Sequence, residues 1–198
     1  LVEQTLADIE IILVDNGSTD QSREMMADYQ AQFPEMIRCA YLEETVGLGQ
    51  ARNRGMELAQ GEYLTFVDAG DFVEPAMCED LYFAADGADI CGADYWTEFG
   101  GNTRDVYPNY GPGREMNARK LETYLNGCGS FATRLYRREY LQAHGIRFLE
   151  DTHFEATYFV FMSALHAAAV EKVNGRYHHI CVDTNAVSVA ERYQRLNI

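Results

Sequence analysis

The chain has 198 residues, of which 47% are hydrophobic and 12% aromatic, so it can fill one hydrophobic core of ordinary size, and a single domain is expected. Its formal charge of −15, with no basic cluster, excludes nucleic acid as a favoured partner, because a phosphate backbone would be repelled. No stretch approaches the roughly 20 apolar residues of a membrane span, and five scattered cysteines without a C-x-x-C pair favour a reducing compartment, so we expect a cytoplasmic protein, with the inner face of the membrane as the alternative.

Strands and helices alternate over the first half of the chain. Apolar runs that end in turn residues predict strands over residues 8–15, 36–42, 62–68 and 88–96. Helical periodicity and helix-start residues predict helices after Ser18 or Thr19, over residues 47–60 and after Pro75. Strands that alternate with helices pair mostly in parallel, so we expect an α/β fold with a mostly parallel sheet flanked by helices.

The regular alternation ends at Trp96. Residues 97–113 are rich in Gly, Asn, Pro and charge without a period, which predicts a long loop or lid. Beyond them we expect a helix over 118–125, a strand running into a helix over 131–145, a buried helix over 154–169 and a last strand over 175–182. No internal repeat appears, so one domain remains the expectation.

Ligands of parallel sheets bind just beyond the carboxyl ends of the strands. Three sets of residues lie at such positions, namely residues 15–18, residues 47–54 and residues 68–71. The first set alone is typical of a capped turn, and the arginines of the second would suit a solvated helix face. Carboxylates of the third set, after an apolar strand, suit a divalent cation that bridges a diphosphate, although Asp71 would also suit the start of the next helix.

The three sets occur together, and the stretches that hold them resemble one family. "DIEIILVDNGSTDQS", "GLGQARNRGMELAQGEYLTFVDAGDFVEP" and the later "RLYRREYLQAHGIRF" are similar to the family-two glycosyltransferases, whose catalytic domain has the GT-A fold. The resemblance runs from Leu1 to about Ser188 and implies one GT-A-like domain over residues 1–198, with a nucleotide-sugar-binding part over 1–96 and an acceptor-side part over 97–198. The family's first strand would precede Leu1, so we expect the domain to lack it and the donor pocket to be open on one flank.

The resemblance implies an inverting transferase for polysaccharide biosynthesis. It would move a sugar from a nucleoside-diphosphate donor, a UDP-sugar by preference, to a hydroxyl of a glycan or lipid-linked acceptor. Such an enzyme needs a nucleoside pocket, positive charge beside the leaving diphosphate and a carboxylate that accepts the acceptor's proton. The same resemblance assigns donor binding to seven residues, which are Asp15, Asn16, Gly17, Ser18, Arg52, Asp68 and His178. Asp68 is also the expected ligand of Mg²⁺ or Mn²⁺.

Asn16 departs conservatively from the family's strand-end aspartate, and two further positions, in the metal and base motifs, depart more strongly. Its D-x-D metal motif aligns Asp68 with the first ligand but places Gly70 at the second, and Asp71 is the family's trailing aspartate. Its E-D pair, whose Asp is the proposed base, aligns with Glu155 and Ala156, and alanine accepts no proton. Glu155 and Asp71 are the candidate catalytic residues. Of the nearby carboxylates Glu150, Asp151 and Glu155, the expected substitute base is Glu155, which would equally suit the start of a helix without a catalytic duty.

The departures leave two functions of different class open. The first is an active glycosyltransferase of hexosyltransferase type. The second is a non-catalytic GT-A module that binds a nucleotide sugar or a partner protein. A dinucleotide-dependent oxidoreductase is not favoured, because no G-x-G-x-x-G follows the first strand.

Overall fold

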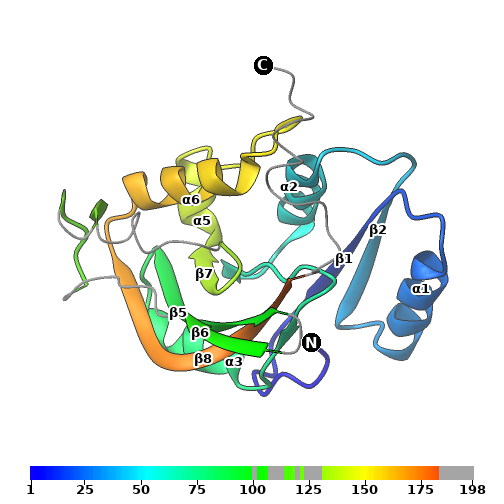
Figure 1. Ribbon diagram of the computed structural model, residues 1–198, viewed down its shortest axis with the longest axis horizontal. Coiled ribbons are helices and arrows are strands. Elements are labelled where there is room, and N and C mark those ends of the chain that lie inside the picture. The colour runs from blue at the N-terminus through cyan, green and yellow to red at the C-terminus, as the bar shows by residue number, and fades with distance from the viewer. Residues whose placement is uncertain (100–101, 107–113, 119–120, 123–130, 183–198) are drawn as a thin grey trace.

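A computed structural model of the chain describes residues 1–99, 102–106, 114–118, 121–122 and 131–182 (Figure 1). The helices are α1 (Ser22–Gln32), α2 (Leu48–Leu58), α3 (Met77–Ala85), α5 (Arg138–Ala143) and α6 (Glu155–His166). The strands are β1 (Ile11–Asn16), β2 (Ile37–Leu42), β3 (Tyr63–Leu64), β4 (Phe72–Val73), β5 (Ile90–Phe99), β6 (Asn102–Val106), β7 (Arg134–Arg137) and β8 (Val170–Val182). None of the described helices is both long and apolar enough to cross a bilayer.

The strands form two sheets rather than one. β1 and β2 pair in parallel as a separate sheet, whereas the other strands form a second sheet in the order β3-β7-β5-β8-β4, with β6 paired to β5. In this larger sheet β5 and β8 run parallel, and the other described pairings are antiparallel. The α/β class is as expected, but the expectation of a mostly parallel sheet is wrong. Parallel pairing of neighbouring strands needs a long crossover connection. β6 starts directly after β5 along the chain, so these two strands pair antiparallel.

One edge of β1 has no strand partner in the described part of the chain. Within the described residues β1 pairs with β2 alone, and β3, shorter than the strand expected over 62–68, pairs with β7. The apolar residues of β1 between Ile11 and Asp15 stay half-buried. Helix α2 lies against this sheet, since a Cβ on Gly55 would be 3.5 Å from Cγ2 of Val14. β1 is thus held by β2 and α2, while its other edge has no strand partner in the described part of the chain.

The second half departs from expectation in two further places. The segment expected as a loop or lid includes the end of β5 and all of β6, which form an antiparallel hairpin with Trp96 opposite Asp105. β8 begins at Val170 rather than at Gly175. Residues 107–113 and part of the helix expected over 118–125 lie outside the described residues.

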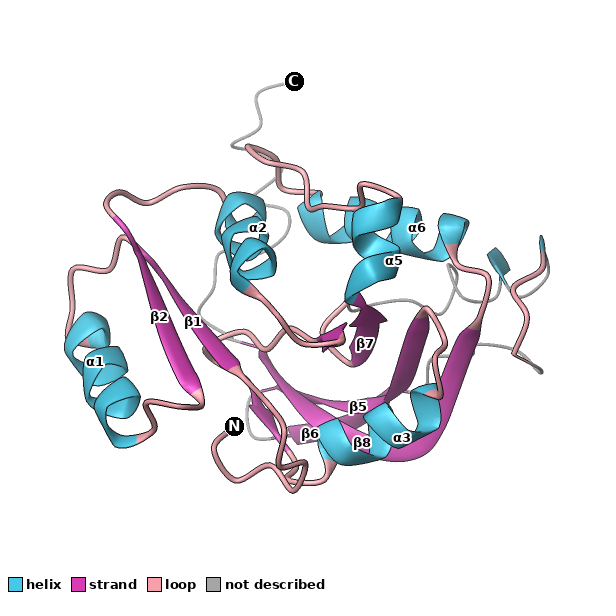
Figure 2. Ribbon diagram, turned by 180° about the vertical axis from the view of Figure 1, so that it is seen from behind, coloured by secondary structure: helices cyan, strands magenta, loops and turns pink. Residues whose placement is uncertain are grey.

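Helices cover both faces of the larger sheet, with α5 and α6 on one side and α3 on the other (Figure 2). On the α6 side Phe159 is fully buried, and its ring stacks on that of Phe148 at 4.1 Å between centroids. On the α3 side Met77 and Leu81 are fully buried beside Cys91. Burial of a side chain of this size contributes about 1.5–3 kcal/mol. This packing fixes α6, and with it Glu155 at the start of the helix.

Candidate active site

Arg52 of α2 joins two carboxylates that are far apart in the sequence. Its Nη1 donates a hydrogen bond to Oε1 of Glu155 at 2.9 Å, and its Nη2 donates to Oδ1 of Asp68 at 3.0 Å. Glu155 is the first residue of α6, and Asp68 lies in the segment between β3 and β4. The structure therefore brings together one expected donor-binding arginine, the expected metal ligand and the expected base.

Two aromatic rings support the Arg52 guanidinium. Its Cζ lies 4.5 Å from the ring centroid of Phe131 and 5.5 Å from that of Phe148, and a cation is stabilised over the face of such rings. The exposed fraction of the side chain is 13% for Arg52 and 9% for Glu155, but 55% for Asp68. The ion pair with Glu155 is therefore shielded from water, whereas Asp68 faces solvent.

Close packing of α2 against the chain before α6 sets this geometry. A Cβ on Gly49 would lie 1.9 Å from the carbonyl oxygen of Leu149, so the approach requires glycine. Asn53 fastens the same contact, because its Nδ2 donates to the carbonyl of Phe148 and its Oδ1 accepts from the N–H of Phe148, both at 2.9 Å. Gly49 and Asn53 both belong to the stretch "GLGQARN", which thus encodes the position of Arg52 as well as its charge.

The side chains of Asp15 and Asn16 fasten the turn after β1. Asp15 accepts hydrogen bonds from the N–H of Ser18 at 3.1 Å and from Nε of Arg23 at 2.6 Å. Burial of Asp15 disfavours its charged form, but the hydrogen bonds from Ser18 and Arg23 outweigh burial and hold the pKa of this carboxyl below its usual range. Asn16 bonds both backbone groups of Val46 at 2.9 Å. Asp15 and Asn16 therefore hold the turn against its neighbours, and their role in donor binding stays a prediction.

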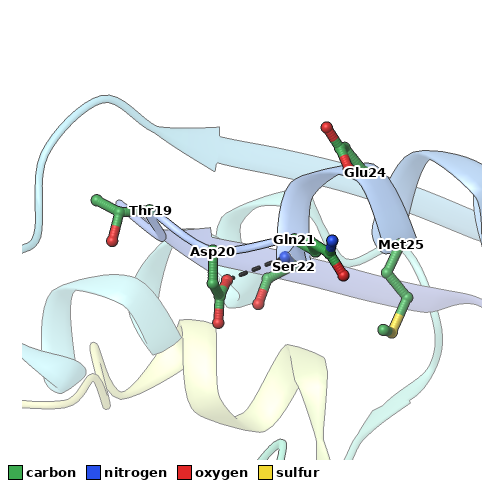
Figure 3. Close-up of a pocket in the computed structure, with 6 residues that line it drawn as sticks. All are labelled: Thr19, Asp20, Gln21, Ser22, Glu24 and Met25. Atoms are coloured by element: carbon green, nitrogen blue, oxygen red, sulfur yellow. Dashed lines mark hydrogen bonds between the residues drawn. The ribbon is translucent and has the colours of Figure 1, made fainter.

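Gly17 and Ser18 lead from this turn to a shallow depression. Gly17 has φ of 72°, and a Cβ on it would lie 2.6 Å from the backbone nitrogen of Thr45, so only glycine fits. Figure 3 shows the residues that line the depression, which are Thr19, Asp20, Gln21, Ser22, Glu24 and Met25. The N–H of Ser22 donates to Asp20 there at 3.0 Å. One continuous segment supplies the whole lining, so this is an open, polar surface beside the turn.

Asp71 links the start of β4 to β8, and among the described residues no hydrogen bond or ion pair joins it to Arg52. Its Oδ2 lies 2.9 Å from Nε2 of His178, and its Oδ1 accepts from the N–H of Cys181 at 2.9 Å. The side chain of His178 has no exposed surface. His178 therefore presents no surface to a ligand, contrary to the expectation that it faces the donor. The assignment of Asp71 to catalysis stays a prediction.

The neighbouring histidine lies in a different environment. Both ring nitrogens of His179 lie 3.0 Å from carboxylate oxygens, one of Glu74 and one of Glu98, and its ring stacks on Phe72 at 4.1 Å between centroids. The hydrogen bond from His179 lowers the pKa of Glu98. Adjacent residues of a strand point to opposite faces, which explains why His178 is buried while His179 joins surface carboxylates.

This site offers a divalent cation one solvent-exposed carboxylate, that of Asp68. In the part of the chain that the structure describes, no group of three or more His, Cys, Asp or Glu side chains is placed to hold a metal ion. Asp68 supplies an exposed carboxylate, while an added Cβ on Gly70 would meet no atom within 4 Å. Mg²⁺ and Mn²⁺ need several oxygen ligands. The residues present fit such an ion only if the phosphates of a donor supply most of those oxygens.

The sequence did not single out Phe131, Phe148 or Asn53 as site residues. Asn53 stands beside Arg52, so its polar side chain at a helix position was an available signal. Phe131 and Phe148 carry no local signal, because their position under Arg52 depends on how distant segments pack. Arg54, in contrast, pairs with Glu57 on the exposed face of α2, as a solvated helix arginine would.

Comparisons with known proteins place the chain in one family. One family model, described as Glycosyl transferase family 2, matches residues 1–145. The chain is 32% identical to EpsH of Bacillus subtilis (strain 168), which is named as a glycosyltransferase, over 98% of this chain and 58% of EpsH. It is 33% identical to the cholesterol galactosyltransferase of Borreliella burgdorferi, over 89% of this chain and 53% of that protein.

A solved structure has the same fold. The crystal structure of S. aureus TarS residues 1–349 in complex with UDP-GlcNAc superposes with a TM-score of 0.77, at 21% identity, over 98% of this chain and 57% of that one. The expected GT-A fold is therefore confirmed. The chain spans 53% to 58% of the length of these three proteins.

Proposed function

The chain belongs to glycosyl transferase family 2, and on that basis we propose that it transfers a sugar from a nucleoside-diphosphate donor to an acceptor hydroxyl in the synthesis of a surface glycan. The observation that supports this function is the group formed by Arg52, Asp68 and Glu155. It combines a cation that suits a leaving diphosphate with a carboxylate that can accept a proton.

The donor side lies in residues 1–96 in this proposal. The turn of Asp15 to Ser18 holds the nucleoside, and Arg52 donates to the diphosphate. A UDP-sugar is the proposed donor, a choice supported by the likeness to a TarS structure that contains UDP-GlcNAc. Mg²⁺ or Mn²⁺, bound to Asp68 and the phosphates, would supply further positive charge beside the leaving group.

Glu155 is the proposed base. The acceptor oxygen bonds to the anomeric carbon as the bond from that carbon to the diphosphate breaks, and the hydroxyl proton passes to Glu155. This direct displacement inverts the anomeric configuration. Arg52, which itself lies over the ring of Phe148, pairs with the nearly buried carboxylate of Glu155, so the orientation of Glu155 is restricted before an acceptor arrives.

The acceptor side lies in residues 97–198 in this proposal. A glycan or lipid-linked acceptor with transfer of a hexose is supported by a relative whose name is cholesterol galactosyltransferase. The site of action would be the cytoplasm or the inner face of the membrane. The edge of β1 that has no strand partner among the described residues is the proposed place where a further strand pairs.

A second candidate function is a non-catalytic module that binds a nucleotide sugar or a partner protein. Three features favour it. Gly70 supplies no side-chain ligand for a metal, Ala156 accepts no proton, and the carboxylate of Glu155 is paired with Arg52. A protein of this kind would bind the donor without turnover.

Glu155→Gln distinguishes the two functions. General-base catalysis contributes roughly 100- to 10,000-fold, so this change should lower sugar transfer or donor hydrolysis by about 100-fold or more without weakening UDP binding. Glu150→Gln is the matched control, because Glu150 contacts Asn53 rather than Arg52. Unchanged turnover in Glu155→Gln would contradict the base assignment. Donor binding without turnover in the unaltered protein would support the non-catalytic module, and Ala156→Asp combined with Gly70→Asp should then raise hydrolysis by orders of magnitude.

A further inference from the structure

One guanidinium serves both the donor side and the base. Arg52 uses Nη1 for Glu155 and Nη2 for Asp68, and among the described residues no hydrogen bond or ion pair joins the two carboxylates to each other. Any influence of a ligand at Asp68 on Glu155 therefore has a direct physical route through Arg52.

The two ends of Arg52 differ in how easily they exchange partners. Glu155 is nearly buried, and the guanidinium beside it rests on Phe131, so water screens this ion pair little. Asp68 is more than half exposed, so water competes for Nη2 and the bond contributes little stability. An anion that arrives from solvent should therefore replace Asp68 on Nη2 and leave the bond between Nη1 and Glu155 in place.

We propose that Arg52 couples diphosphate binding to the position of Glu155. Arg52 is a positioning residue, which holds the carboxylate of Glu155 until the negative charge of the leaving diphosphate attracts the guanidinium. In the structure the guanidinium of Arg52 pairs with two carboxylates. With a diphosphate oxygen on Nη2, the same cation bridges the leaving group and the base. This inference rests on the proposed function, which assigns the donor to Arg52 and proton transfer to Glu155.

The coupling acts while the sugar is transferred. As the bond from the anomeric carbon to the diphosphate oxygen breaks, that oxygen gains negative charge and attracts the guanidinium more strongly. The ion pair between Arg52 and Glu155 therefore weakens as the acceptor hydroxyl loses its proton. The proton then resides on Glu155, the new bond joins the acceptor oxygen to the anomeric carbon, and the diphosphate departs with the electron pair.

Thermodynamic reciprocity makes the coupling measurable without turnover. If a phosphate on Nη2 weakens the pair of Arg52 with Glu155, then removal of the charge of Glu155 must strengthen phosphate binding. We expect Glu155→Gln to tighten UDP about fivefold or more, by calorimetric titration of the full chain in EDTA. In an Arg52→Gln background the same change should shift the dissociation constant by less than about twofold.

A matched control separates this coupling from simple charge repulsion. Glu150→Gln removes a nearby carboxylate that does not contact Arg52, and it should change UDP affinity by less than about twofold. If Glu155→Gln leaves UDP affinity unchanged, or changes it equally with and without Arg52, the coupling is wrong while the proposed function can stand. If the unaltered chain binds no UDP at all, the proposed donor and the coupling are both wrong.

A second set of variants covers the case in which Arg52→Gln fails to fold. Asp68 is exposed, so Asp68→Asn should fold normally and, in EDTA, should tighten UDP by freeing Nη2. Because Asp68→Asn and Glu155→Gln act on one guanidinium, their combined effect should depart from the product of the single effects by about threefold or more. Effects that multiply within about twofold would show independent action and overturn the coupling.

Discussion

Gly49→Ala tests whether the close approach of α2 to Leu149 holds the Arg52 site together. The new Cβ would lie 1.9 Å from the carbonyl oxygen of Leu149, so helix and chain must separate. Overpacking costs about 1–3 kcal/mol, and a clash with backbone belongs at the upper end, about 3 kcal/mol. The better helix propensity of alanine offsets about 1 kcal/mol. The free energy of unfolding should fall by about 2 kcal/mol, which lowers the Tm of a chain of this length by about 4–8 °C.

Gly55→Ala on the same helix is the matched control. Its Cβ would meet Val14 at 3.5 Å, an ordinary contact, so helix propensity dominates and stability should rise by up to about 1 kcal/mol. Urea unfolding followed by circular dichroism measures both variants. Because Gly49→Ala also moves Arg52 away from Glu155, it should weaken UDP binding, whereas Gly55→Ala should not. Stability of Gly49→Ala equal to that of the unaltered chain, or a shift of both variants in the same direction, would refute the packing explanation.

Further substitutions test the carboxylates one by one. Asp71→Asn should lower the free energy of unfolding by about 1–3 kcal/mol, because it weakens the bonds to His178 and Cys181, and should leave Mn²⁺-dependent UDP binding intact; the reverse pattern would make Asp71 a site residue. Asp68→Asn should change the free energy of unfolding by no more than about 0.5 kcal/mol, because Asp68 is exposed, and should abolish the Mn²⁺ dependence of UDP binding. If UDP binding still depends on Mn²⁺ in this variant, the metal lies elsewhere. Gly70→Asp enters open space and should tighten Mn²⁺ with UDP about tenfold or more, as a second carboxylate ligand would; no gain would show that this loop does not reach the metal. The folded-state pKa of Asp15 is depressed, so its ionisation stabilises the fold above about pH 4 and this contribution disappears as pH falls through the folded value. Asp15→Asn should therefore cost stability at neutral pH and little in acid, and a cost independent of pH in urea unfolding would contradict the assignment.

Local patterns in the sequence predicted the elements that depend on local signals. The apolar runs before Asp15 and after Met36 form β1 and β2, and the stretch from Gly47 forms α2, because burial periodicity and turn chemistry act within a few residues. The apolar segment after Phe154 forms α6, as its composition indicates. The confirmed fold class follows from these elements together with the family resemblance.

Strand pairing could not be predicted in the same way. The antiparallel hairpin of β5 with β6, and the insertion of β7 between β3 and β5, depend on contacts between distant segments that leave no period in the sequence. The same limit applies to the site. The residue types of Arg52 and Asp68 indicated binding of a diphosphate and a cation. The hydrogen bonds that join Arg52 to Asp68 and Glu155, however, depend on the close approach of α2 to Leu149. Alternation along β8 predicts that His178 and His179 point to opposite faces, but which of the two is buried depends on packing against distant residues such as Asp71.

Calorimetric titration of UDP into the full chain, with and without Mn²⁺, tests the central claim most directly. The claim is that Arg52, Asp68 and Glu155 form the donor end of a transferase site. UDP should bind, Mn²⁺ should strengthen the binding, and Arg52→Gln should weaken it by about tenfold or more, because a charge-assisted bond to phosphate is lost. Absence of UDP binding at millimolar concentration, or binding that is unchanged in Arg52→Gln, would contradict the claim.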